Sequence, residues 1–266
     1  MECIQKTIAK TNHFDIVPLG DVQYGNVNTD LDKFKEMIKW IKNEPNCYTI
    51  LMGDMCEGIT IADKRFDILS VYPNLRDRID DIAMAEYQEM RDLLKPIKDK
   101  ILCALRGNHG ETLRKHHGVD FDGWLCKELG ITNAGYMSFL RIKIDDVHAS
   151  PVTFFLQHGF MASRKKGAKV NGIEDLAAGF DADVFLLGHS HELNVSSNAY
   201  LYMDSRGNLA EKVRYFGHCG SFLKSYKQGT FNYAEVKAYP PLKTGVIKLI
   251  FDVKANSKKI SIHARE

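Results

Sequence analysis

Five short polar clusters in this sequence combine the residue types that bind divalent metal ions. Carboxylates, amide oxygens and imidazole nitrogens together suit a metal of intermediate hardness, and a glycine in each cluster lets the backbone turn sharply near an ion. A lone Gly-Asp pair would indicate only a turn, but five such clusters in order predict a metal site. The clusters are Gly20-Asp21-Val22-Gln23, Gly53-Asp54, Gly107-Asn108-His109, Gln157-His158-Gly159 and Gly188-His189-Ser190-His191.

An apolar run of strand length precedes each cluster. In open α/β sheets, ligands bind beyond the carboxyl ends of the strands, so the five clusters are expected to meet at one edge of the fold. The runs cover residues 14–19, 47–52, 101–105, 152–156 and 183–187.

Helical patterns separate several of these runs. Thr29 can cap a helix whose apolar residues have helical spacing over 31–41. Asn171 and Glu174 have the spacing of a capping box, which predicts a helix that begins at Asn171. Strands and helices in alternation, followed by a β-rich tail from residue 195 onward, predict an α/β sandwich.

The composition is that of an ordinary globular protein of 266 residues. A formal net charge of +2 is far from the strongly basic balance of a dedicated duplex-binding protein. The six cysteines have neither CxxC spacing nor the spacing of a disulfide framework. The first residues of the sequence lack a signal-peptide pattern. No apolar run approaches the ~20 residues needed to cross a bilayer. We therefore expect a single domain over residues 1–266, in a cytoplasmic protein that does not enter membranes.

In this order, the clusters resemble the motifs of the calcineurin-like metallophosphoesterase superfamily. Those motifs are Asp-x-His, Gly-Asp-x-x-Asp/Glu, Gly-Asn-His-Asp/Glu, a His that follows a strand, and Gly-His-x-His. The resemblance spans about residues 15–221 and includes Gly220-Ser221. The stretch from Tyr215 to Pro241 is similar to members found in phages and prophages, which makes a phage-encoded protein one expectation. The resemblance implies a four-layer αββα sandwich with two mixed β-sheets, the metallophosphoesterase fold.

The resemblance also implies two divalent metal ions held by residues of the five clusters. Asp54 would bridge the two ions. The remaining ligands would be Asp21, Gln23 and His191 for one ion, and Asn108, His158 and His189 for the other.

The resemblance gives His109 a catalytic role beside Asn108 and Asp54. His109 would face the substrate, where it would stabilise phosphoryl charge or protonate the leaving oxygen. A hydroxide bridging two ions about 3.5–4 Å apart would attack phosphorus in line, without a covalent enzyme intermediate.

Two positions depart from the family pattern. Gln23 stands where most members have His, and its carbonyl oxygen would make that site richer in oxygen, which favours Mn²⁺ and leaves Mg²⁺, Fe²⁺ and Zn²⁺ open. The Mn-dependent ADP-ribose and CDP-alcohol diphosphatases are similar here, with Asp-x-Gln. The alternative is that Gln23 lies behind the ligands and that this ion binds weakly.

Gly110 stands where Asp or Glu often orients the catalytic His, so Glu111 or another group would have to hold His109.

The basic segment between the last two clusters bears on the substrate. Its cations could hold additional phosphates of a nucleic acid or a dinucleotide, and the alternative is a solvated surface turn. Gly58 follows Glu57 where the protein phosphatases have Arg, which argues against a protein substrate. The cations are Arg164, Lys165, Lys166 and Lys169.

Three functions remain open from the sequence. The first is a metal-dependent phosphodiesterase that acts on DNA, RNA or nucleotides. The second is a small-molecule nucleotide pyrophosphatase or phosphomonoesterase with ADP-ribose-like substrates, which the Asp-x-Gln motif and the low net charge favour. The third is an inactive phosphoesterase fold that serves as a binding subunit, which the nearly complete ligand set argues against. A homodimer is compatible with each of them.

Overall fold

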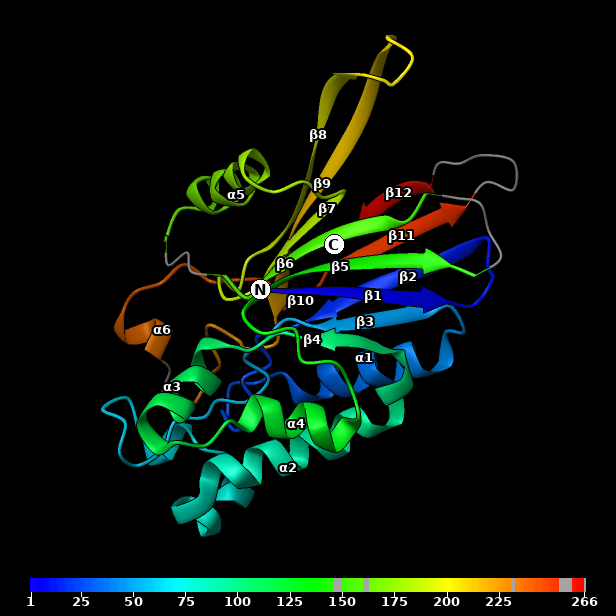
Figure 1. Ribbon diagram of the computed structural model, residues 1–266. Helices are drawn as coiled ribbons and strands as arrows, with labels where there is room; N and C mark the ends of the chain where they lie inside the picture. Colours follow the sequence, from blue (N-terminus) through cyan, green and yellow to red (C-terminus); the bar gives the residue numbers. More distant parts are fainter. Residues whose placement is uncertain (146–149, 160–162, 231–232, 254–259, 266) are drawn as a thin grey trace.

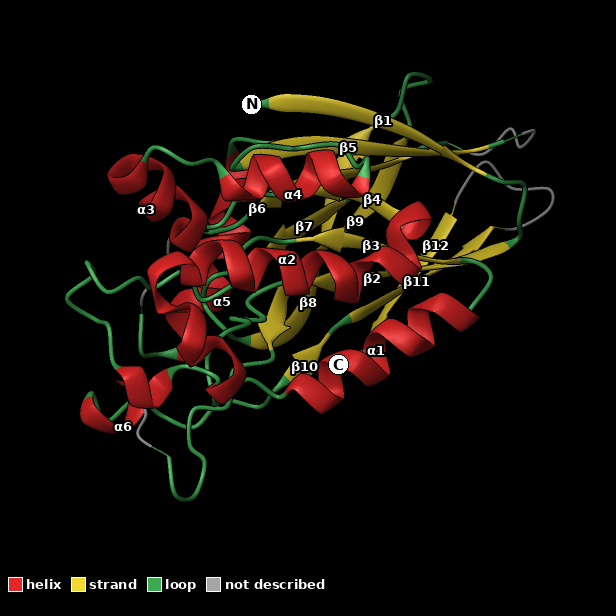
Figure 2. Ribbon diagram, turned by 90° about the horizontal axis from the view of Figure 1, so that it is seen from below, coloured by secondary structure: helices red, strands yellow, loops and turns green. Residues whose placement is uncertain are grey.

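Two mixed β-sheets face each other at the centre of the computed structural model, and helices cover their outer faces (Figure 1, Figure 2). The structure describes residues 1–145, 150–159, 163–230, 233–253 and 260–265. Its strands are β1 (Glu2–Ile8), β2 (His13–Leu19), β3 (Cys47–Leu51), β4 (Ile101–Ala104), β5 (Met137–Ile144), β6 (Val152–Gln157), β7 (Val184–Leu187), β8 (Leu193–Met203), β9 (Leu209–Ser221), β10 (Gly245–Val246), β11 (Lys248–Val253) and β12 (Ile260–Arg265).

The helices lie mainly between the strands of the first half of the chain. Short 3-10 segments are η1 (Ile68–Ser70), η2 (Pro73–Asp81), η3 (Lys95–Lys100) and η4 (Leu176–Ala178). The α-helices are α1 (Leu31–Asn43), α2 (Ile82–Leu94), α3 (Asn108–His117), α4 (Phe121–Leu129), α5 (Lys166–Asp175) and α6 (Tyr233–Val236). In the described part of the chain, every helix is too short or too polar to span a lipid bilayer.

The five-stranded sheet carries the first three polar clusters. Its strand order is β12-β11-β2-β3-β4, and β2, β3 and β4 run parallel to one another. These three strands are covered on both faces, which is why each appears in the sequence as a nearly continuous apolar run. Their carboxyl ends lie at one edge of the sheet, next to Asp21, Asp54 and Asn108.

The seven-stranded sheet carries the last two polar clusters. Its order is β1-β5-β6-β7-β9-β10, with β8 paired to β9 outside this path. Strands β6, β7 and β9 are parallel, whereas β5, β8 and β10 each run antiparallel to a neighbour. Strand β6 ends directly before His158, and β7 ends directly before the cluster that contains His189 and His191.

Apolar side chains fill each interface between the layers. Phe14 and Phe154 belong to the cluster between the two sheets. A second cluster joins α1, α2 and α4 to the outer face of the five-stranded sheet and includes Phe34 and Tyr87. A third joins α5 to the outer face of the seven-stranded sheet through Ile173 and its neighbours. The four-layer αββα sandwich with two mixed sheets is therefore confirmed.

Two predicted helix starts are wrong. Asp30, not Thr29, occupies the N-cap position of α1, because the Thr29 hydroxyl donates instead to backbone oxygens of the first cluster, at 2.7 and 3.1 Å. Helix α5 begins at Lys166, so Asn171 lies inside it. Glu174 makes no capping box, since its carboxylate accepts hydrogen bonds from side chains of β8.

Strand β1 has no counterpart in the sequence prediction. It pairs in parallel with β5 at the edge of the seven-stranded sheet, and most of its side chains are exposed or half-buried. An edge strand of this kind shows little of the apolar pattern that marks a buried strand.

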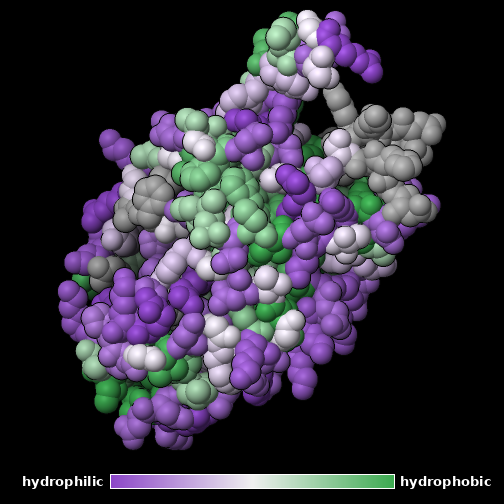
Figure 3. All heavy atoms as spheres, viewed as in Figure 1, coloured by the Kyte–Doolittle hydropathy of each residue, from purple (hydrophilic) through white to green (hydrophobic). Residues whose placement is uncertain are grey.

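Strands β8 and β9 continue beyond the body of the molecule as a two-stranded arm (Figure 1). One face of the arm packs near α5, where Arg214 stacks on Tyr200. The other face carries the exposed side chains of Leu201, Met203 and Leu209, and Figure 3 shows apolar atoms at the end of the arm.

Candidate metal centre

Three of the predicted ligands converge where the two sheets meet. Asp54, His158 and His189 each offer one ligand atom, and these atoms all lie within 4.8 Å of one another. Asp54 follows β3 of one sheet, whereas the two histidines follow β6 and β7 of the other. The site therefore exists only when the two sheets pack face to face.

Hydrogen bonds leave one ring nitrogen of His158 free to face the site. Its Nδ1–H donates to the backbone oxygen of Met52 at 2.7 Å, which assigns the donor to that nitrogen. Nε2 then lies 3.2 Å from Asp54 Oδ2 and 2.9 Å from Asn108 Oδ1. This is the arrangement of a metal-binding imidazole, in which one nitrogen is anchored to backbone and the other points at the ion.

The electrostatics of this group show how strongly its members interact. Burial by itself would raise the pKa of Asp54, but the neighbouring His158 and His109 hold that pKa well below its usual range. Burial would lower the pKa of His158, yet Asp54 raises it to about 10. Without a cation, a proton on His158 balances the buried carboxylate. A divalent ion would displace that proton and take over the same role.

Backbone conformation marks the same residues. Among the described residues, six that are not glycine have positive φ, and five of these are predicted ligands. Residues other than glycine reach this region only when the surrounding structure holds them there, and such strain concentrates at functional sites. The five are Asp21 (φ 49°), Gln23 (φ 54°), Asp54 (φ 49°), His189 (φ 60°) and His191 (φ 52°).

Two buried oxygens in the first cluster have no hydrogen-bond partner within the described residues, and they test whether metal ions fit here. They are Asp21 Oδ1 and Gln23 Oε1. Leaving such an atom unpaired is unfavourable, by about 1–3 kcal/mol or more when it is charged. Asp21 Oδ1 lies 3.4 Å from His191 Nε2, and Asp21 Oδ2 accepts the His189 backbone N–H at 2.9 Å. Oxygens and imidazoles placed in this way fit divalent cations.

Glycine is required where the clusters approach one another most closely. A Cβ atom built on Gly107 would lie 2.0 Å from Asp54 Oδ1, and one on Gly53 would lie 2.6 Å from His158 Nδ1. Either side chain would push a predicted ligand out of place. Ser221 also holds the first cluster in place, since its hydroxyl donates to the Asp21 backbone oxygen at 2.8 Å.

His109 is held by backbone, not by Glu111. Its Nδ1–H donates to the Glu57 backbone oxygen, and its backbone N–H donates to Asp54 Oδ1 at 2.9 Å. Burial lowers the pKa of the ring, but Asp54 and Glu57 raise it above its usual value. Glu111 instead forms an ion pair with Arg114 at 2.7 Å, so the suggestion that Glu111 orients His109 is wrong.

A carboxylate from the next helix, α4, occupies the space beside Gly110. A Cβ atom on Gly110 would lie 2.1 Å from Asp122 Oδ2. Asp122 belongs to α4 and accepts hydrogen bonds from the Tyr87 hydroxyl at 2.8 Å and the Gly107 backbone N–H at 3.3 Å. It thereby supports the loop that presents Asn108 and His109. The sequence analysis missed Asp122, because nothing near it in the chain resembles a motif.

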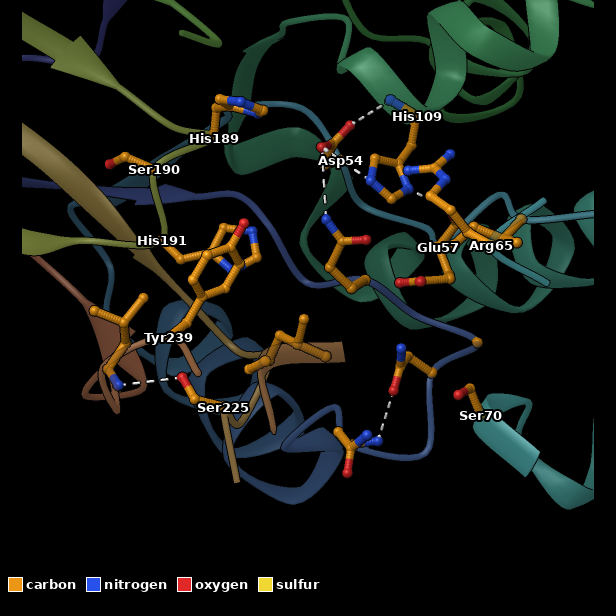
Figure 4. Close-up of a pocket in the computed structure, with 18 of the residues that line it drawn as sticks. Asp54, Glu57, Arg65, Ser70, His109, His189, Ser190, His191, Ser225 and Tyr239 are labelled. Atoms are coloured by element: carbon orange, nitrogen blue, oxygen red, sulfur yellow. Dashed lines mark hydrogen bonds and ion pairs between the residues drawn. The ribbon is translucent and has the colours of Figure 1, made fainter. Parts of the chain in front are cut away.

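Four of the predicted ligands line a pocket of about 440 Å³ (Figure 4): Gln23, Asp54, His189 and His191. Asp54, His109 and His189 lie on one side of it in this view, with Tyr239 across from them. The wall also includes Arg65, whose guanidinium binds the Asp63 carboxylate at 2.7 Å. The sequence analysis did not single out Arg65 or Tyr239 as site residues, since both come from segments that carry no metal ligand.

The four cations of the basic segment do not share one environment. Arg164 and Lys169 line the pocket, whereas Lys165 and Lys166 are exposed and lie outside its wall. Lys169 is buried, and its Nζ donates to the Ser190 backbone oxygen at 3.0 Å and to Glu192 at 3.3 Å. Arg164 is therefore the one of the four that is both exposed and directed to the pocket.

Comparisons with known proteins show only remote likeness. No protein-family model and no curated protein matches the sequence. Among solved structures, a Vps29 single mutant from Entamoeba histolytica is similar at 11% identity and a TM-score of 0.41, over 95% of this chain and 98% of that chain. A metallophosphoesterase from Sphaerobacter thermophilus is similar at 11% identity and a TM-score of 0.39, over 95% and 88%. A predicted phosphoesterase from Streptococcus pneumoniae is similar at 9% identity and a TM-score of 0.37, over 96% and 99%.

Proposed function

We propose that this chain is a metal-dependent phosphodiesterase that acts on nucleotides or nucleic acid. The observation that carries the proposal is the convergence of carboxylate, amide and imidazole atoms from five loops, with two buried oxygens left without a partner. The ligands we propose are Asp21, Gln23, Asp54 and His191 for one ion, and Asp54, Asn108, His158 and His189 for the other. Bound there, the ions would supply the Lewis acidity for attack by water on a phosphate.

His109 has the geometry of a proton donor or a positive charge at the reacting phosphate. Its Nδ1–H is fixed by the Glu57 backbone oxygen, so Nε2 is the nitrogen that faces Asp54, at 3.9 Å, and the pocket. Burial opposes protonation of the ring, but Asp54 and Glu57 raise its pKa, which favours the imidazolium form. An imidazolium at this position can stabilise phosphoryl charge and donate its Nε2 proton to the departing oxygen.

The arginines of the pocket support a phosphate-bearing substrate. Arg65 lines the pocket, and Asp63 fixes its planar guanidinium there. Arg164 has no carboxylate partner within the described residues. Arginine is well suited to phosphate because its guanidinium donates several hydrogen bonds in one plane.

A substrate panel tests the proposal. Mn²⁺-loaded protein is given bis(p-nitrophenyl) phosphate, p-nitrophenyl phosphate, ADP-ribose, and single- and double-stranded oligonucleotides. We expect turnover of the diester well above that of the monoester, and at least 10³-fold loss in Asp54→Asn, because the substitution removes one of the two negative charges among the proposed ligands. Asp99→Asn, on the exposed side of η3, is the matched control and should keep full activity.

Other outcomes of the panel separate the alternatives. Turnover of ADP-ribose alone would replace the phosphodiesterase proposal with a nucleotide pyrophosphatase. Bound metal with no turnover of any substrate would indicate a binding subunit and would contradict an enzymatic role.

A further inference from the structure

The pocket has an apolar wall that the proposed chemistry does not use. This wall comes from two segments that are distant in sequence: residues 59–71, around η1, and residues 223–242, after β9. Apolar and aromatic surface beside a cluster of polar ligands is the usual composition of a site for a small organic molecule. The residues that form it are Ile59, Phe66, Val71, Leu223, Tyr239 and Leu242.

Backbone contacts fix the position of Tyr239 in this wall. Its N–H donates to the Ala234 backbone oxygen at 3.0 Å, and its backbone oxygen accepts from the Tyr226 hydroxyl at 2.5 Å. Ala238, directly before it, has φ 49°, and Pro240 follows it. Ala238 is the sixth described residue that is not glycine and has positive φ, and it is the one that is not a predicted ligand. The chain is therefore strained at the metal ligands and at the residue that presents Tyr239.

Arg164 lies against the ring of Tyr239. Its guanidinium carbon is 5.0 Å from the ring centroid, and both residues line the pocket. Arg65, the other arginine of the wall, is engaged by a carboxylate, whereas Arg164 has only this ring contact in the described part of the chain. The guanidinium covers one face of the Tyr239 ring, so another planar ring can stack on the outer side of the guanidinium or on the opposite face of the tyrosine.

We infer that this part of the pocket is a subsite for a planar ring of the substrate, a nucleobase, which stacks with the Tyr239–Arg164 pair. The inference rests on the proposed phosphodiesterase function and assigns the residues that would hold the base of its nucleotide substrate. The phosphate would lie at Asp54 and His109, and the base would lie across the pocket at Tyr239 (Figure 4). A volume of about 440 Å³ lies within the range of sites that bind small organic molecules.

Two substrates with the same leaving group test the subsite. Thymidine 5′-(p-nitrophenyl) phosphate carries a base, and methyl p-nitrophenyl phosphate does not. We expect the Mn²⁺-loaded wild-type protein to have a KM about tenfold lower for the thymidine ester, because stacking of one base on an aromatic side chain contributes roughly that factor or more. Both esters release p-nitrophenolate, so their kcat values can be compared directly.

Variants of the stacking residue separate a direct from a structural role. Tyr239→Ala should raise KM about tenfold for the thymidine ester and leave both constants for the methyl ester within about twofold. Tyr239→Phe keeps the ring and should keep the preference. The matched control is Tyr202→Ala, since Tyr202 is 48% exposed on the arm and Tyr239 is 37% exposed. Calorimetry with thymidine 5′-monophosphate provides a readout that does not depend on turnover, and binding should weaken in Tyr239→Ala alone.

The outcomes distinguish the inference from the function on which it rests. If neither ester is hydrolysed, the phosphodiesterase proposal fails. If both are hydrolysed with equal KM in the wild type and in Tyr239→Ala, the subsite is refuted and the function stands. An equal loss on both esters in Tyr239→Ala would show that Tyr239 supports the fold of the site, and it too would overturn the inference.

Discussion

At the scale of single residues, the predicted metal site combines buried oxygens that have no hydrogen-bond partner in the described residues with backbone of positive φ. Gln23 shows both, since its Oε1 is buried without a partner in the described residues and its φ is 54°. Its Nε2 lies 3.5 Å from Asp54 Oδ2, a distance too long for a strong hydrogen bond. These facts favour direct ligation by the carbonyl oxygen over a place behind the ligands.

Removing the Gln23 amide should weaken one of two metal sites. For Gln23→Ala we expect calorimetric titration with Mn²⁺ to show one site lost, or weakened by more than the roughly 10- to 100-fold that follows when only a group behind the ligands is removed. Gln23→His should shift the preference toward Zn²⁺, because imidazole is the softer ligand. Gln5→Ala, on the exposed edge strand, serves as the control. Unchanged Mn²⁺ affinity and stoichiometry in Gln23→Ala would show that Gln23 is not a ligand.

At the scale of elements, helix α4 supports the start of α3 through one carboxylate. Asp122 fills the space above Gly110 and accepts hydrogen bonds from Tyr87 of α2 and from the backbone of Gly107. Asp122 therefore stands in the space that a side chain at position 110 would need.

An acidic side chain at position 110 should destabilise this protein. In Gly110→Asp the new side chain would clash with Asp122 and bury a second carboxylate beside it, which we expect to lower the free energy of unfolding by at least ~2 kcal/mol. The double variant Gly110→Asp/Asp122→Gly should recover most of that loss, because the space is then free. Urea denaturation measures both variants. If the free energies of unfolding lost in the two single variants simply add in the double variant, the two side chains do not compete for the same space.

The same carboxylate predicts a pH dependence of stability. Burial raises the pKa of Asp122 to about 6, above the usual value of about 3.9 in an unfolded chain. Because the folded-state pKa is the higher one, its favourable contribution is complete below about pH 4 and is lost as the pH rises through 6. That loss is about 3 kcal/mol.

A substitution that cannot ionise should remove this dependence. Relative to the wild type, Asp122→Asn should gain up to ~3 kcal/mol in the free energy of unfolding between pH 4 and pH 7.5. Urea denaturation of both proteins in EDTA measures the difference without bound metal. A difference that stays constant with pH would mean that Asp122 ionises in the folded protein as it does in water.

At the scale of the whole molecule, the predicted site joins the two sheets. Asp21, Asp54 and Asn108 come from one sheet, and His158, His189 and His191 from the other. A ligand set of this kind does not exist in the unfolded chain, so metal binding stabilises the folded state by mass action. The free energy gained is about 4 kcal/mol at a concentration a thousandfold above Kd.

Thermal unfolding should report this coupling. Saturating Mn²⁺ should raise Tm by about 10 °C, since each kcal/mol shifts Tm by ~2–4 °C in a chain near this length. EDTA should reverse the shift, and Asp54→Asn should lose more than half of it. Scanning calorimetry or intrinsic fluorescence measures Tm, and an equal shift in Asp54→Asn would place the ions elsewhere.

The sequence by itself determined the strands before each cluster, the order of the clusters and the fold class. Buried parallel strands must be continuously apolar, and metal ligands must be of few chemical types, so both leave patterns that can be read locally. The strand predictions therefore hold to within a residue or two, whereas Thr29 and Asn171 failed as helix caps. Both residues are of types that cap helices. In the folded chain, however, Thr29 donates to backbone oxygens of the first cluster, and Asn171 lies inside α5.

The tertiary structure alone decided how the site is supported and what surrounds it. His109 is held by a backbone oxygen of Glu57, and a backbone atom leaves no trace in a residue pattern. Lys169 is buried and forms an ion pair with Glu192, so it does not face the substrate side of the pocket as an unpaired cation. Asp122 of α4 lies next to the third cluster. Tyr239 enters the pocket from a segment with no motif. Each of these contacts joins residues that are distant in the chain or uses the backbone, and only packing brings them together.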